Sequence, residues 1–128
     1  MRRLDRRTAW GFFCILTLGT VSAAPQAKAA DATTHEFTVA NIEFEGTKMF
    51  VPAVLVVHKG DTVKITVVNN IQSEPPNHGF AIAEFKVEEV VNRGETKEVE
   101  FTADKAGIFD IKCHLHPAHV HGQLLVHE

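Results

Sequence analysis

Short apolar segments, alternating or β-branched and separated by turn residues, dominate the chain from residue 35 onward. Alternation with a period of two places successive side chains on opposite faces of a strand, so these segments favour strands over helices. We expect strands over residues 35–42, 53–57, 62–68, 78–82, 96–101, 108–113 and 122–127, and an irregular or extended segment over 84–91. So many short strands predict an all-β domain, either a β-sandwich or a small barrel.

Turn residues set the connections between these segments. Lys59-Gly60-Asp61 separates two expected strands, which we expect to pair as a hairpin. Pro75-Pro76 marks a loop before the strand that begins at His78, and residues 92–95 turn the chain back on itself.

The first 29 residues have the pattern of a secretory signal followed by a processing region. Four arginines precede an apolar stretch over residues 9–21, which is shorter than the roughly 20 residues needed to span a bilayer. Cleavage after Ala23 and cleavage after Ala29 both fit the small-residue rule, and no membrane helix is expected to remain. We therefore expect a periplasmic or extracellular protein whose single domain covers residues 30–128.

Export leaves an acidic chain with one cysteine. From Ala30 onward the chain carries 8 lysines and arginines against 15 aspartates and glutamates, a net charge of −7, which argues against a nucleic-acid partner. Cys14 leaves with the signal, so Cys113 has no partner for an intrachain disulfide. In an oxidising compartment such a thiol is expected to be buried, bound to a metal or paired with a second chain.

Strand parity predicts where this thiol points. Phe109, Ile111 and Cys113 share one face of the expected strand, so the thiol should point inward at the rim of the fold. The following loop can return His116 and His121 to the same rim.

His78, after the Pro75-Pro76 loop, can supply a fourth donor at that rim. A thiolate with imidazoles suits copper or zinc rather than calcium or magnesium. His119 is the alternative to His121 if the loop winds differently, and is otherwise expected to be solvated, with His114 pointing away. Glu74 and Glu84 are expected to be solvated, with the alternative that one adds a carboxylate.

These residues resemble the cupredoxin family. The resemblance covers nearly all of the mature chain and rests on the Cys-x2-His-x4-His run, on Ala106–Phe109 before the cysteine strand, and on His78-Gly79-Phe80. Within that family the chain is most similar to the nitrosocyanins, a group of red copper proteins, in Gly94–Lys97, Phe101–Gly107 and Leu115–Pro117.

The resemblance implies a Greek-key β-sandwich that holds one copper ion through His78, Cys113 and His116. His121 stands where cupredoxins have a weak axial methionine, and His78 stands where nitrosocyanins have a glutamate. An axial imidazole should favour Cu(II) and shift the colour from blue toward green or red.

The implied role is that of a one-electron carrier with transient redox partner proteins and no inserted membrane segment. Two alternatives stay open, a redox enzyme acting on a small molecule such as a nitrogen oxide, and a periplasmic copper carrier. Zinc, held by one cysteine and three histidines, is the alternative metal.

Overall fold

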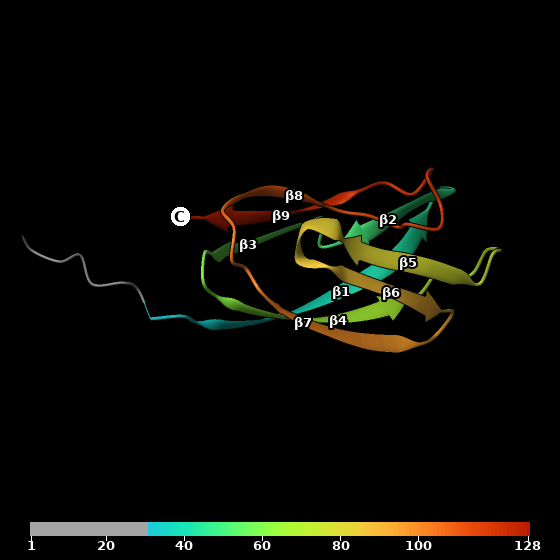
Figure 1. Cartoon of the computed structure of the whole chain (residues 1–128). Helices are drawn as coiled ribbons and strands as arrows, with labels where there is room; N and C mark the ends of the chain where they lie inside the picture. The colour runs from blue at the N-terminus through green and yellow to red at the C-terminus, as the bar shows by residue number, and fades with distance from the viewer. Residues whose placement is uncertain (1–30) are drawn as a thin grey trace, which may run out of the picture.

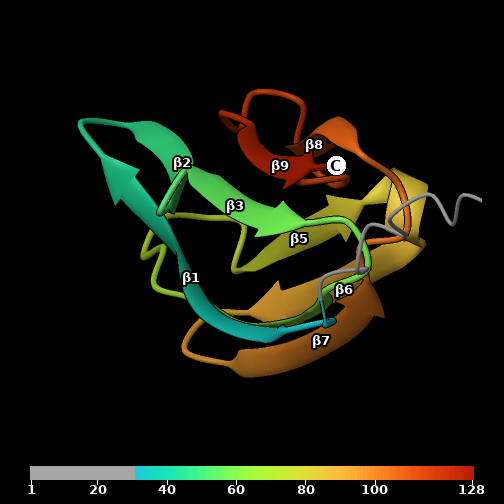
Figure 2. The same cartoon turned by 90° about the vertical axis from the view of Figure 1, so that its left-hand side faces the viewer.

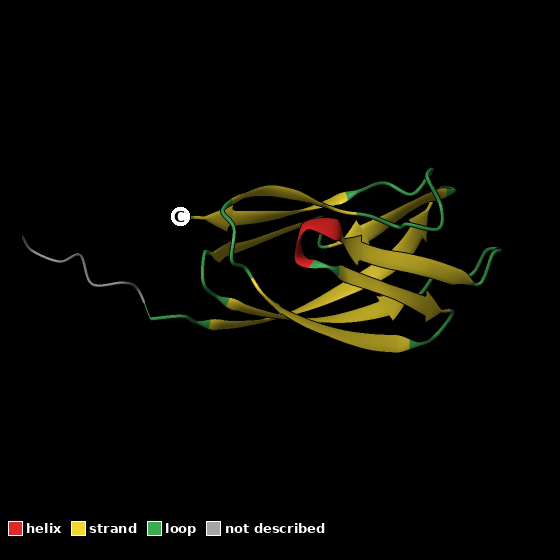
Figure 3. Cartoon of the chain, viewed as in Figure 1, coloured by secondary structure: helices red, strands yellow, loops and turns green. Residues whose placement is uncertain are grey.

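The computed structural model describes residues 31–128, so the expected export signal and Cys14 lie outside the described residues. The regular secondary structure of this part of the chain is strand, apart from one short helical turn (Figures 1 and 3). The elements are β1 (Thr34–Phe44), β2 (Thr47–Val51), β3 (Val54–His58), β4 (Thr62–Asn69), β5 (Asn77–Ile82), η1 (Ala83–Phe85), β6 (Val87–Asn92), β7 (Thr96–Thr102), β8 (Gly107–Ile111) and β9 (Gly122–His127). Within residues 31–128, η1 is far too short to cross a membrane and no other helix is present that could.

Two main sheets form the layers of the predicted β-sandwich. One sheet has the order β2-β1-β4-β7 and the other the order β3-β9-β8, and Figure 2 shows them facing each other. Alternate residues of both sheets point inward, as the period-two pattern predicted, and form one core. Its largest fully buried aromatic side chains are Phe50 and Phe80, which meet edge to face with ring centroids 5.6 Å apart.

The expected hairpin between β3 and β4 is wrong. β3 pairs in parallel with β9 and β4 pairs in parallel with β1, so the Lys59-Gly60-Asp61 turn carries the chain from one sheet to the other. Both strands have one buried and one more exposed face, and these buried faces meet across the core instead of lying side by side. Asp61 fixes the crossover by accepting backbone N–H bonds from Thr33 and His58, each at 2.9 Å.

The sequence did not predict β2, and it predicted β6 only as part of an irregular or extended segment. β2 follows a tight turn at Glu45-Gly46, where both residues have positive φ, and pairs antiparallel with β1. The segment expected to be irregular or extended divides into η1 and β6, and β6 pairs with β5.

The β5–β6 pair lies along the open side between the main sheets (Figure 1). Ala81 and Lys112 exchange two backbone hydrogen bonds, of 2.8 and 2.9 Å, just beyond the end of β8. This bridge brings β5, which begins at Asn77, alongside the chain that leads to Cys113.

The core at Phe50 gives a direct test of the fold. Phe50→Ala should lower the free energy of unfolding by about 3–5 kcal/mol, because a fully buried aromatic ring is lost and the cavity is only partly filled. Phe44→Ala is the matched control, since Phe44 is 63% exposed, and should change stability by less than about 0.5 kcal/mol. Urea unfolding of both variants measures the difference, and equal losses would contradict this core.

Candidate metal centre

Cys113 is the buried centre of the site. Its side chain points inward from the chain just after β8, as strand parity predicted, and it is 5% exposed. The sulfur accepts the backbone N–H of Gly79 on β5 at 3.1 Å. Such a bond stabilises a thiolate, the form of cysteine that binds metal.

Gly79 is needed for this contact. A Cβ added there would lie 2.5 Å from Nδ1 of His114 and 2.9 Å from the His114 backbone nitrogen, closer than real Cβ contacts come. The absence of a side chain therefore lets the β5 backbone approach the cysteine segment.

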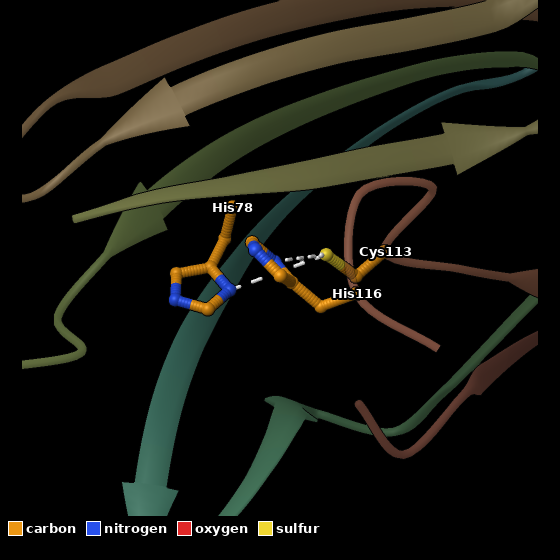
Figure 4. A group of neighbouring side chains, drawn as sticks. All are labelled: His78, Cys113 and His116. Carbon is orange, nitrogen blue, oxygen red and sulfur yellow. Dashed lines mark hydrogen bonds between the residues drawn. The ribbon is translucent and has the colours of Figure 1, made fainter. Parts of the chain in front are cut away.

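Two histidines present the same ring atom to the sulfur. Nδ1 of His116 lies 3.4 Å from Cys113 Sγ, and Nδ1 of His78 lies 4.0 Å from it (Figure 4). Donor atoms of the three residues all lie within 4.8 Å of one another, and the two imidazole centroids are 4.8 Å apart. With bonds of about 2 Å to nitrogen and slightly more to sulfur, three donors at this spacing can share one ion.

A well-bonded loop positions His78. The buried Asn69 amide donates to the carbonyls of Pro76, at 3.1 Å, and Val91, at 2.9 Å. Arg93 donates to the carbonyls of Ile71 and Ser73 from the other side of the loop. The start of β5 is therefore held in place before any ion binds.

Burial keeps His78 neutral. The pKa of its imidazole is lowered from 6.5 to about 4, first by burial and then by the neighbouring His116, His119 and Lys48. A neutral imidazole has a free lone pair, so the ring is ready to bind metal at neutral pH. Its Nε2 is buried without a hydrogen-bond partner among residues 31–128.

The structure does not bring His121 to these three residues. Its side chain is 46% exposed and its Nδ1 lies 4.0 Å from an Asp110 carboxylate oxygen. The sequence placed His121 here by its spacing from Cys113, but spacing alone does not fix which residues of an irregular loop turn inward.

His119 is the enclosed histidine of the loop, so the expectation that it is solvated is wrong. It is 3% exposed, its ring lies 4.4 Å from the Phe50 ring, and its centroid is 5.9 Å from that of His78. Nε2 lies 2.8 Å from Asn41 Oδ1 on β1, and Nδ1 lies 3.0 Å from the Val120 carbonyl. Burial is the largest cause of its lowered pKa.

The other sequence candidates lie outside the group. Glu74 is exposed and pairs with Arg93 at 2.9 Å, and Glu84 is exposed on η1. His114 is not part of the donor group, and its ring covers Gly79, with Nε2 3.9 Å from a Glu88 carboxylate oxygen. Within residues 31–128 the donor set is thus one sulfur and two imidazole nitrogens, which fits copper, with His119 beside it.

Comparison with known proteins agrees with this fold and donor set. A family model described as a cupredoxin-like domain matches residues 12–126, and the chain therefore belongs to the cupredoxin-like family. The fold, the buried cysteine and its two histidines are thus those of a copper-binding cupredoxin domain.

The chain is similar to parts of two reductases and to a copper-binding protein. Nitrous-oxide reductase from Cupriavidus necator is 44% identical over 55 residues, which cover 43% of this chain and 9% of that protein. A copper nitrite reductase from Nitrosomonas europaea matches with a TM-score of 0.63 and 25% identity over 73% of this chain and 41% of that one. A copper-binding protein solved in its apo form matches with a TM-score of 0.56 and 25% identity, over 79% of this chain and 92% of that one. The chain spans less than half of either reductase.

The buried histidines make the metal-free protein sensitive to acid. Between about pH 6.5 and about pH 4 the unfolded chain protonates His78 while the folded protein does not, so the unfolded state binds more protons. The free energy of unfolding should therefore fall by up to about 3 kcal/mol as the pH falls through this window. The pKa of His119 is also lowered by burial, so this residue adds to the loss of stability at low pH.

Urea unfolding of the metal-free protein at several pH values measures this loss. His78→Gln removes one of the titrating groups and should give a flatter dependence on pH. An unchanged slope in this variant would show that His78 is not the group responsible.

Proposed function

We propose that this protein is an exported, mononuclear copper protein that carries one electron at a time. The observation that supports this most is the preformed group of a buried sulfur and two imidazole nitrogens, already within 4.8 Å of one another. A rigid set of thiolate and imidazole donors compromises between the preferences of the two copper oxidation states, so little has to rearrange on electron transfer.

The exposure of the three residues supports a carrier. His78 and Cys113 are buried, whereas His116 is half-buried and is followed by the exposed Pro117 and Ala118. Electrons would then enter and leave through the His116 imidazole edge, while the sulfur stays shielded from water and oxidants.

Partners and location follow from sequence features. The basic and apolar start of the chain supports export to the periplasm or beyond, and the acidic mature chain favours transient redox partners with basic surfaces. An imidazole in place of the axial thioether extends this proposal to a green or red copper centre.

Loading with Cu(II) tests the proposal. One equivalent should give an intense visible thiolate-to-copper absorption band, and reduction and reoxidation should interconvert the two forms without loss of copper to a chelator. Cys113→Ser should remove the band, because the sulfur is its source. His114→Gln alters the neighbouring residue, which is not part of the donor group, and should keep the band.

Other results would point to other functions. Loss of copper on each reduction would favour a copper carrier, and a preference for zinc would overturn the redox role. The names of the similar reductases favour a second candidate, a redox enzyme acting on a nitrogen oxide. A change in the copper spectrum on adding azide or nitric oxide would support that candidate over a pure carrier.

We assign the fourth side chain at the copper to His119 in place of the expected His121. The buried His119 ring lies near the group, with its centroid 5.9 Å from that of His78, whereas the His121 side chain is 46% exposed and lies toward Asp110. Both ring nitrogens face acceptor oxygens, Nδ1 the Val120 carbonyl and Nε2 Asn41 Oδ1, so the His119 ring must turn to offer a lone pair to the ion.

One substitution at two positions tests this assignment. His119→Met replaces an imidazole by a weaker thioether donor and should move the absorption toward a single blue band. His121→Met should leave the absorption and paramagnetic resonance spectra of the copper form unchanged. If His121→Met changes the spectra and His119→Met does not, the fourth side chain at the copper is His121.

A further inference from the structure

A second pair of histidines lies at the end of the sandwich opposite Cys113. His58 ends β3, His127 ends β9, and the two are directly paired in the parallel register of these strands. In Figure 1 both strands end on the left, near the C-terminus, whereas the loop that carries His116 lies on the right. Figure 2 looks onto the end that carries this pair.

The two rings are close enough to share an ion. Their centroids are 5.8 Å apart with an angle of 36° between the ring planes. The two histidines of the buried centre have centroids 4.8 Å apart. The His58 side chain is 67% exposed, so a change of side-chain torsion can close the remaining distance to nitrogen–metal bonds of about 2 Å.

Asp61 places a negative charge beside the pair. Its carboxylate is almost fully buried, accepts the His58 backbone N–H at 2.9 Å and lies 2.8 Å from His35 Nε2. The same oxygen lies 3.9 Å from His58 Nδ1, beyond hydrogen-bond distance. Its charge favours a cation bound by His58.

The charged residues next to the pair in sequence are Lys59 and Glu128. They form an ion pair with each other at 3.2 Å, so the ammonium charge is partly neutralised. The exposed Glu128 side chain follows His127 directly and can add an oxygen donor.

We propose that His58 and His127 form a second, solvent-exposed site for a divalent transition metal, with Cu(II) the preferred ion. Two imidazoles bind Cu(II) more tightly than the other divalent first-row metals, and water or Glu128 completes the coordination. With no sulfur donor, this site holds Cu(II) without the intense colour of the Cys113 centre and exchanges it readily with solution.

Titration of the full protein with Cu(II) beyond one equivalent tests the site. Calorimetry should detect a second, weaker equivalent, and paramagnetic resonance should show nitrogen coupling without any increase in the thiolate band. His58→Gln and His127→Gln should each weaken the second equivalent by at least about tenfold, because one of two nitrogen donors is lost. His114→Gln, which removes an imidazole at the other end of the sandwich, should leave it intact.

The result is independent of the buried centre. If Cys113 and its neighbours fail to bind copper, the paramagnetic resonance signal that depends on His58 and His127 should still appear, without a thiolate band. A second equivalent that survives both substitutions, or no binding beyond the first equivalent, would overturn the proposal. Both histidines are exposed, so these variants should fold, which thermal unfolding checks.

Discussion

The candidate centre depends on how β5 is held against the chain that ends in Cys113. His78 and Cys113 are 35 residues apart, and two backbone hydrogen bonds between Ala81 and Lys112 join their segments. With that pairing fixed, Gly79 presents its N–H to the sulfur and His78 presents Nδ1. The site is thus built mainly from backbone pairing, and the side chains need little freedom to complete it.

Burial then sets the chemistry of the group. The backbone N–H donated to the sulfur stabilises its thiolate form, and an imidazole whose pKa is lowered to about 4 is neutral at neutral pH. His78 is therefore already in the form that binds metal and needs to lose no proton when an ion binds. The other ring nitrogen of His78, Nε2, is buried with no hydrogen-bond partner among the described residues, and this costs stability.

The sequence predicted which residues face the core better than which strands pair. Alternation fixed the inward side of Phe109, Ile111 and Cys113, because a period of two leaves only two faces. It carried no information on pairing partners, so β3 and β4 were joined wrongly as a hairpin. His119 was missed for a similar reason: its burial depends on Phe50 and Asn41, which are distant in sequence, and no local pattern marks such contacts.

The central claim is that one copper ion lies among Cys113, His78 and His116. A crystal structure of the copper-loaded protein, with the ion located by its anomalous scattering, tests this most directly. We predict an ion within about 2.5 Å of Cys113 Sγ and of the Nδ1 atoms of both histidines. An ion located elsewhere, with the sulfur unbound, would contradict the account.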